Sequence, residues 1–510
     1  MSTTAESTSI TAEGRATDAA GGPLGAAGAT GNAPGGTPAA SARRLRPFWL
    51  VLLAAALPMF MATLDNLVMT NALPVLHADL GASVEELQWF MNAYTLAFAS
   101  TILMAVAIGD RFGRRTVFVI GIAVFTLSSA LAALAADPGQ LIAARAAQGF
   151  GAAAIMPLSL TLLAGSVPLA RRALAIGIWG GVSGLGVAVG PLVGGAVIEG
   201  WSWQAIFWIN VPIGVIAVVL ALVALPNSFG AKLRADLVGL ALSGLGLLAL
   251  VYGIVRGNDA GWDSTEVLAG LIGGGILLLA FVFWETRAKA PLLPLRLFRD
   301  RSFSVANLVG FGFSFGAFGS VFILIQFLQV VQGASPLEAA VQTTPWTLAP
   351  MIVAPIAGII APRVGTRTLI VIGNLLLGGA LLWLAGLLDA SVEYPAYVAP
   401  FVLAGVGMGL VFAPSATAVL ATMAPVDHAK ASGTNSMVRE VGIALGIAVS
   451  TAVFTGAGGA LTPDLYQVGA QPAVIVAGVV LLATAIVAFA LPSGRQLAGA
   501  SVGAQPGAAA

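Results

Sequence analysis

Residues 48–73 read FWLVLLAAALPMFMATLDNLVMTNAL and contain one charged residue, Asp65. A helix that crosses the bilayer needs about 20 mainly apolar residues, because the hydrocarbon core is about 30 Å thick and each helical residue rises about 1.5 Å. The stretch therefore predicts a transmembrane helix. An ionised carboxylate is costly in hydrocarbon, so Asp65 is also a candidate functional residue.

The remainder of the chain has the same character. Its 510 residues are 58% hydrophobic and include 63 glycines, whereas only 9% are charged. Soluble globular proteins contain about 25% charged residues, so the composition excludes a water-soluble body and predicts an integral membrane protein. Fourteen stretches are candidate spans: 48–73, 86–108, 116–135, 140–166, 173–198, 205–225, 236–255, 265–285, 303–330, 337–361, 367–388, 397–422, 432–456 and 472–491.

The basic residues support this count of spans. If both termini are cytoplasmic, twenty of the 23 Lys and Arg residues fall on the cytoplasmic side, as the positive-inside rule requires. Of the other three, Arg256 lies in a predicted outer loop, and Arg145 and Arg439 lie within spans. One missed span would invert every later loop and destroy this pattern. The sequence therefore predicts a multi-pass protein of the plasma membrane with both termini inside.

Two pairs of motifs recur at nearly one offset. Residues 109–115 (GDRFGRR) correspond to 361–367 (APRVGTR), 252 residues later. A glycine repeat recurs 256 residues later: Gly186 with Gly190, and Gly442 with Gly446. Chance recurrence is the alternative, since Gly and Arg are common here. Two similar helical bundles with a site between them form an architecture for alternating access.

The repeat and the composition together predict five segments. Residues 1–42 are rich in Ser, Thr, Ala, Gly and Pro and lack the apolar residues of a core. The predicted organisation is a disordered cytoplasmic arm (1–47), an N-terminal six-helix bundle (48–228), a central two-helix insert (229–290), a C-terminal six-helix bundle (291–492) and a cytoplasmic tail (493–510).

Several stretches resemble signatures of the major facilitator superfamily, in particular its fourteen-span drug:proton antiporter branch. They are residues 64–74 (LDNLVMTNALP), 109–115 (GDRFGRR), 145–151 (RAAQGFG), 186–195 (GVAVGPLVGG) and 203–212 (WQAIFWINVP). The loop signature departs from the family at Val106, where the family has glycine. The resemblance implies an all-α membrane protein of the major facilitator fold, with two six-helix bundles and a central inserted helix pair.

Four intramembrane charges are candidates for proton coupling: Asp65, Arg145, Arg439 and Glu440. Asp65 and Arg145 lie at similar depths and could share a cavity, in which the arginine would act electrostatically because it keeps its proton. Alternatively, Asp65 is solvated or structural, and Arg145 snorkels to the interface. Arg439 and Glu440 point about 100° apart, so we expect no pairing between them. Glu440 could titrate, face a cationic substrate or form a structural ion pair.

The loop at residues 109–115 is a candidate conformational latch. By resemblance, its latch residues are Asp110, Arg111, Gly113, Arg114 and Arg115. Such loops can pin helix ends by charge-assisted hydrogen bonds in one state and release them in another. Positive-inside topology alone would explain the arginines, but it does not explain Asp110.

The fifth predicted span carries a candidate packing motif, Gly186, Gly190, Pro191, Gly194 and Gly195. Glycines at helical spacing allow another helix to approach closely. The motif indicates a tight, leak-proof contact that favours export, and generic membrane packing is the alternative. Weaker candidates for the substrate cavity are Asn66, Asn71, Gln148, Gln326 and Gln329.

Several activities are disfavoured by what the sequence lacks. It has no phosphate-binding loop, which argues against ATP as the energy source. It has no cysteines, and its two histidines, His77 and His428, fall in opposite predicted loops. We therefore expect no metal, no cofactor and no enzymatic activity, with the proton motive force as energy source. The net charge of +1 argues against nucleic acid as a partner.

These features predict a monomeric, proton-coupled exporter of amphipathic, lipophilic or cationic drugs that works by alternating access. Its partners would be the small-molecule substrate, protons and the lipid bilayer. A specific metabolite or antibiotic exporter, with or without proton coupling, is the alternative. A membrane receptor or scaffold is a further alternative, but it would not explain the intramembrane charges or the repeated halves.

Overall fold

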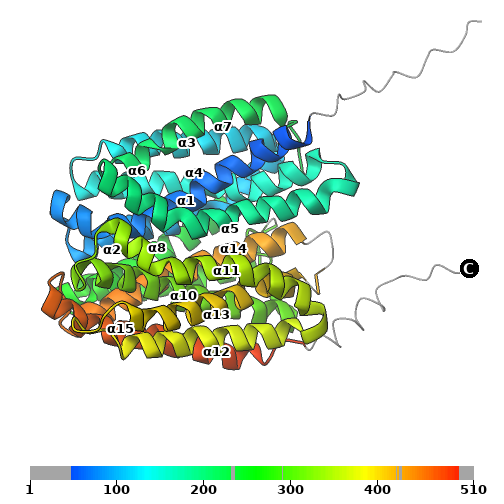
Figure 1. The fold of residues 1–510 in the computed structure, drawn as a ribbon. Helices are drawn as coiled ribbons and strands as arrows, with labels where there is room; N and C mark the ends of the chain where they lie inside the picture. The colour runs from blue at the N-terminus through cyan, green and yellow to red at the C-terminus, as the bar shows by residue number, and fades with distance from the viewer. Residues whose placement is uncertain (1–46, 231–235, 290, 421, 424–427, 493–510) are drawn as a thin grey trace, which may run out of the picture. The chain divides into compact units, whose positions relative to one another are not determined.

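Helices form all the regular secondary structure that is described in a computed structural model of the chain (Figure 1). The described residues are 47–230, 236–289, 291–420, 422–423 and 428–492. The predicted arm before residue 47 and the predicted tail at 493–510 lie outside them. Within the described part there is no strand, and the all-α prediction is confirmed.

A helix occupies each of the fourteen predicted spans. Thirteen helical stretches of the described residues are long and apolar enough to cross a membrane, and α5, at the remaining predicted span, is 32 residues long. Helices α6 and α7 share the sixth span and meet at Ile209. The helices are α1 (Phe48–Leu80), α2 (Val84–Phe112), α3 (Arg114–Ala133), α4 (Pro138–Ser166), α5 (Leu169–Gly200), α6 (Ala205–Trp208), α7 (Asn210–Ala224), α8 (Leu237–Ala260), α9 (Thr265–Glu285), α10 (Arg301–Val330), α11 (Pro336–Val364), α12 (Thr366–Ala385), α13 (Pro395–Leu420), α14 (His428–Gly456) and α15 (Pro463–Ala488), with a short 3-10 helix, η1 (Leu295–Arg299).

Local sequence explains most helix ends. Ser83 and Glu86 form a capping box at the start of α2, and Ser335 and Glu338 form another at the start of α11. Each pair satisfies backbone N–H groups that the first helical turn would otherwise leave without partners.

Several helices exceed their predicted spans, and α1 and α15 do so by the most residues at one end. Helix α1 continues past Pro74 to Leu80, and α15 begins at Pro463 rather than at residue 472, with Pro472 inside the helix. The predicted boundaries were wrong because proline ends helices less strictly in membrane proteins, where neighbouring groups can satisfy the freed backbone.

The predicted internal repeat reappears in the packing. Figure 1 shows α1, α3, α4 and α7 grouped together, apart from α10, α12, α13 and α15. Equivalent pairs pack in each half: α1 on α5 as α10 on α14, α2 on α4 as α11 on α13, and α3 on α4 as α12 on α13.

The loops at 109–115 and 361–367 share an unusual backbone. Gly113 and Gly365 have φ values of 108° and 94°, in a region that side-chain-bearing residues rarely adopt. Gly113 joins α2 to α3, and Gly365 joins the corresponding helices of the repeat, α11 and α12. This end of the molecule, which carries the loops at 109–115 and 361–367, is named the basic end below, and the other is named the opposite end.

The two halves meet through helices that also correspond in the repeat. Helix α5 packs on α11 and α2 packs on α14, with a smaller contact between α1 and α10. The central hairpin α8–α9 joins these contacts, because α8 packs on α2 from the first half and on α14 from the second. The domain boundaries at 228/229 and 290/291 stay predictions.

Candidate functional site

Asp65 and Arg145 form a buried ion pair between α1 and α4. An Arg145 Nη1 donates to Asp65 Oδ2 at 2.5 Å, and the two residues are 4% and 0% exposed. Asp137 caps the first turn of α4 by accepting from the Gln140 N–H, which fixes where the helix starts and places Arg145 two turns later. The structure thus brings these two predicted residues together, and their burial argues against a solvated aspartate and a snorkelling arginine.

Two amide side chains also donate to the Asp65 carboxylate. Asn210 Nδ2 donates to Oδ1 at 2.7 Å, and Gln148 Nε2 donates to the same oxygen at 3.2 Å. Both amides reach Ser129 on α3, whose Oγ accepts from Gln148 at 2.7 Å and from Asn210 at 3.3 Å. The Asp65 carboxylate of α1 is therefore contacted from α4 and from the α6–α7 junction, and Ser129 of α3 joins the two amides.

Arg145 is fixed by contacts beyond the ion pair. Its Nε donates to the Phe90 carbonyl at 3.0 Å, and its Nη1 also donates to Gln148 Oε1 at 2.9 Å. The guanidinium lies over the Tyr94 ring, 4.6 Å from the centroid. These contacts tie α4 to α2 as well as to α1.

This network can hold a charge that the membrane interior disfavours. A buried ion pair offsets the cost of desolvation only when further hydrogen bonds satisfy both partners. Here the carboxylate accepts from a guanidinium and two amides.

Sequence reasoning missed three members of this network: Tyr94, Ser129 and Asn210. A signal for Asn210 exists, because it is the one polar side chain within the span at 205–225. An amide in an otherwise apolar span needs a buried partner. Ser129 gives no comparable signal, because serine is tolerated in membrane helices by bonding its own backbone.

Arg439 and Glu440 lie apart from the Asp65 network, on α14. The Arg439 guanidinium lies over the Phe412 ring of α13, 4.5 Å from its centroid. Among the described residues no ion pair joins Arg439 to Glu440, and Glu440 Oε2 is buried without a hydrogen-bond partner. Helix α14 packs on α2, which carries Tyr94.

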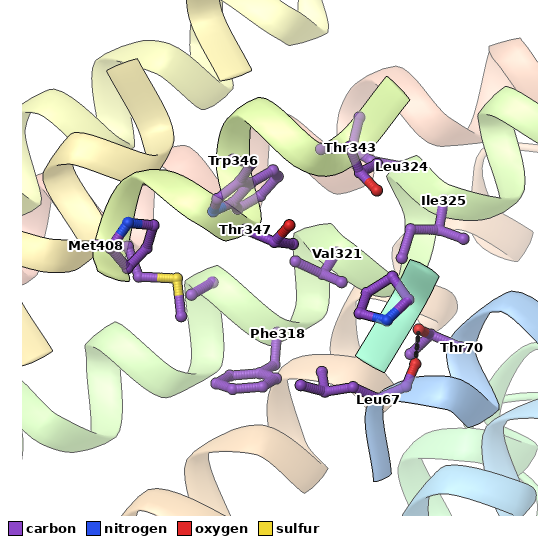
Figure 2. Close-up of a pocket in the computed structure, with 13 residues that line it drawn as sticks. Leu67, Thr70, Phe318, Val321, Leu324, Ile325, Thr343, Trp346, Thr347 and Met408 are labelled. Atoms are coloured by element: carbon purple, nitrogen blue, oxygen red, sulfur yellow. Dashed lines mark hydrogen bonds between the residues drawn. The ribbon is translucent and has the colours of Figure 1, made fainter. Parts of the chain in front are cut away.

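A small apolar cavity of about 40 Å³ lies between the two halves. Figure 2 shows α1 residues Leu67 and Thr70 near Phe318 and Val321 of α10, with Trp346 of α11 across the space. Its polar lining side chains are three threonines and the indole of Trp346, and none of its lining residues is charged. Small-molecule sites have volumes of about 300–1,000 Å³, so the cavity would have to widen before it could hold a compound of drug size.

The five weaker cavity candidates do not line this space, as the described residues define it. Gln148 belongs to the Asp65 network, and Gln326 bonds its own helix at the Phe322 carbonyl. Gln329 donates to the Asn71 carbonyl, and Asn71 donates to the Pro191 carbonyl, so these two residues connect helices. Asn66 is half-buried.

The candidate latch contacts the segment that follows α7. Asp110 Oδ1 accepts from Arg114 Nε at 2.7 Å, and the Asp110 carbonyl accepts from the Gly230 N–H at 2.9 Å. Asn227 Oδ1 accepts from the Arg115 N–H at 3.2 Å. The described partners of Arg114 and Arg115 lie in the first half.

The remaining latch residues are close to these contacts. Arg111 lies over the exposed Phe112 ring at 5.3 Å. A Cβ at Gly113 would lie 2.5 Å from the Asn227 side chain, so the loop needs glycine for space as well as for its φ value.

The glycines of the fifth span lie at close helix contacts. A Cβ at Gly186, Gly190 or Gly194 would meet side chains of α1 at 2.9–3.3 Å. Gly195 instead faces α11, where a Cβ would lie 2.6 Å from the Pro336 carbonyl. The motif therefore packs α5 against α1 and also against the other half, and Pro191 accepts the bond from Asn71.

No group of three or more His, Cys, Asp or Glu side chains that could hold a metal occurs in the described part of the chain. Two related helical halves with a cavity between them, and a buried ion pair within one half, are features of membrane carriers. A family model described as Major Facilitator Superfamily matches residues 48–294 and 306–506. The chain belongs to the Major Facilitator Superfamily.

Similar proteins include named resistance and export proteins. The tetracenomycin C resistance and export protein of Streptomyces glaucescens is 34% identical, covering 86% of this chain and 81% of that protein. The puromycin resistance protein pur8 of Streptomyces alboniger is 36% identical, covering 88% and 89%. A crystal structure of a POT family transporter in complex with 5-aminolevulinic acid shares the fold, with a TM-score of 0.66, 14% identity and coverage of 88% of this chain and 96% of that one.

Proposed function

We propose that this protein is a proton-coupled exporter of amphipathic, lipophilic or cationic compounds across the plasma membrane. It would act as a monomer without a cofactor, with both termini in the cytoplasm and the proton motive force as energy source. The basic end would then face the cytoplasm. The relatives named for resistance and export support the export direction.

The observation that supports proton coupling best is the burial of Asp65 in a network of donors within the first half. Asp65 lies on the same helix as the cavity residues Leu67 and Thr70. Movement of α1 as substrate binds would therefore also move the carboxylate relative to its donors. Loss of donors favours proton uptake, and their return favours release.

In the proposed cycle, Asp65 takes a proton while the opposite end is open. The halves then rock, the cavity opens at the basic end, and Arg145 with the two amides re-forms around the carboxylate as the proton leaves to the cytoplasm. Substrate binds and is carried outward in the other leg. Moving one charge through 100 mV supplies about 2.3 kcal/mol, enough for a substrate gradient of more than tenfold.

A specific antibiotic exporter is the second candidate. It is favoured by the names of the two relatives, each of which refers to a single antibiotic. A transport panel of lipophilic cations and neutral antibiotics would separate the two candidates, because a multidrug exporter moves several unrelated compounds and a specific one moves a single class.

The proposal is tested in proteoliposomes by imposing a pH gradient and following a lipophilic cationic dye. We expect Asp65→Asn to abolish gradient-driven dye movement, because the amide cannot carry a proton. Asp464→Asn, on the exposed first turn of α15, is the matched control and should transport normally. Normal pumping by Asp65→Asn would show that the coupling residue is wrongly assigned.

A further inference from the structure

The amide nitrogen of the Asn210 side chain has hydrogen-bond partners, whereas its amide oxygen has none. Its Nδ2 donates to Asp65 Oδ1 at 2.7 Å and to Ser129 Oγ at 3.3 Å. Its Oδ1 is buried without a hydrogen-bond partner, and the residue is 0% exposed. An unpaired buried carbonyl oxygen is costly, so this acceptor needs an explanation.

The two protonation states of Asp65 need opposite partners. An ionised carboxylate accepts hydrogen bonds only, whereas a protonated one has an O–H to donate. Arg145 cannot accept that bond, because a guanidinium has no acceptor. Gln148 Oε1 already accepts from Arg145 Nη1, and the Tyr94 hydroxyl is also buried without a partner. Asn210 Oδ1 differs from both because it is unpaired and belongs to an amide that already contacts the Asp65 carboxylate, so a turn of that amide alone brings it to the new O–H.

We propose that Asn210 is a positioning residue whose amide turns over when Asp65 takes a proton. The proposal rests on the proposed function, in which Asp65 carries the proton. With Asp65 ionised, Nδ2 donates to the carboxylate. With Asp65 protonated, a half-turn of the amide places Oδ1 where Nδ2 was, and the new O–H donates to it. The Asp65 carboxyl group then has a matching partner on Asn210 in both protonation states.

The position of Asn210 suits this role. It is the first residue of α7, at the junction with α6, and it reaches α1 and α3 at once. When the amide turns, Nδ2 leaves Ser129, which keeps its bond from Gln148. The protonation state of Asp65 would thereby change the contact between the α6–α7 junction and α3.

Few other charges act on this group. Arg145 comes from α4 and Tyr94 from α2, and Glu440 is on α14, which packs on α2. The other helices that pack on α1, namely α5, α10 and α11, carry their described charged side chains only near their ends: Arg171, Glu199, Arg301, Glu338 and Arg363. Helix α3 carries its two arginines in its first turn, and α6 and α7 carry no charged residue.

The experiment is an infrared pH titration of the purified protein in lipid. It follows the C=O stretching band of the protonated Asp65 side chain. Loss of this band in Asp65→Asn would assign it to Asp65. We expect Asn210→Leu to raise the midpoint of this band by about one pH unit or more, because the ionised form loses a charge-assisted bond. Asn210→Asp, which keeps the shape, should raise the midpoint further, because two carboxylates at this distance share a proton.

The amide itself provides the second readout. In protein with isotope-labelled asparagine, the Asn210 C=O band should shift as Asp65 is protonated, and the shift should be absent in Asp65→Asn and Asn210→Leu. Asn374→Leu is the matched control, since Asn374 is a buried amide that bonds only its own helix at the Ile370 carbonyl. It should leave the Asp65 midpoint unchanged.

Two results would overturn the inference. An unchanged midpoint in both Asn210 variants would show that Asn210 does not position the carboxylate. A labelled amide band that stays fixed while the Asp65 band titrates would show a static donor rather than a turning one. Persistence of the band in Asp65→Asn would instead contradict the proposed function, so the two failures are distinguishable.

Discussion

Arg145 organises the candidate site through three kinds of contact made by one guanidinium. It pairs with Asp65, donates from Nε to the Phe90 carbonyl and lies flat over the Tyr94 ring. A planar group with several fixed donors can make these contacts together, whereas an ammonium is a point charge on a flexible stem. The residue type, and not only its charge, should therefore matter.

We predict that Arg145→Lys lowers gradient-driven dye transport at least tenfold. The lysine keeps the positive charge but loses hydrogen bonds of charged groups worth about 1.5–3 kcal/mol each, and about 1.4 kcal/mol corresponds to a factor of ten. Initial transport rates in proteoliposomes measure the effect. Arg171→Lys, at an exposed position on α5, should retain the parent rate. Equal rates for both variants would mean that Arg145 supplies only its charge.

At the scale of elements, the central hairpin is tied to both halves at the opposite end. Arg256 of α8 pairs with Glu85 of α2 at 3.1 Å and with Glu266 of α9 at 3.2 Å. Asn258 donates to the Ala452 carbonyl at 2.5 Å and to Thr455 Oγ1 at 2.6 Å, both on α14. The hairpin is thus a bridge across the α2–α14 contact.

The two ties should differ in strength. Asn258 is part-buried, and Asn258→Ala removes several hydrogen bonds, each worth about 0.5–1.5 kcal/mol. Arg256 is 32% exposed, and exposed ion pairs contribute about 0–1 kcal/mol. We predict that Asn258→Ala lowers the Tm of the detergent-purified protein more than Arg256→Gln does. The reverse order would show that the ion pairs, rather than the amide, hold the hairpin.

At the scale of the whole molecule, the structure shows the two halves closed together at the opposite end. Gly195 of α5 lies against the backbone of Pro336 and Leu337 at the start of α11. Ser335 Oγ also donates to Glu199 at 2.8 Å across the same contact. A side chain at Gly195 would collide with backbone atoms, which cannot move aside as a side-chain tip can.

We predict that Gly195→Ala opens this contact. Overpacking costs about 1–3 kcal/mol, which shifts the balance between closed and open forms by about five- to over a hundredfold. The chain has no cysteine, so spin labels can be placed directly at exposed positions 201 on α5's cap and 341 on α11, as Trp201→Cys and Val341→Cys. The longer-distance population should increase in the variant.

Gly200→Ala is the matched control on the same helix, because a Cβ there meets nothing within 4 Å. Its distance distribution should equal that of the parent. If the distance distribution of Gly195→Ala also equals that of the parent, the contact between α5 and α11 can accommodate a methyl group. The glycine would then not be needed to close this end.

Features that depend on residues close together in the sequence could be predicted, whereas contacts between residues far apart in the sequence mostly could not. The spans were predictable because each apolar run of about 20 residues must be a helix in a bilayer. The pairing of Asp65 with Arg145 was predictable from their similar depths in the membrane, since intramembrane residues of opposite charge usually pair with one another. Ser129 was not predictable, because nothing near it in the sequence indicates that a carboxylate from α1 and an amide from α7 lie beside it.

The sequence by itself determined the helices, the repeat and the identity of the buried charges, because hydrophobicity, periodicity and charge are local properties. Only the tertiary structure decided which groups surround those charges. Helices distant in sequence must rotate about their axes and approach one another before such contacts form. That arrangement decides which side of α7 faces Asp65, which residue each interhelical glycine meets and which helices the hairpin bridges. That arrangement results from the packing of many side chains at once, and no single stretch of the chain encodes it.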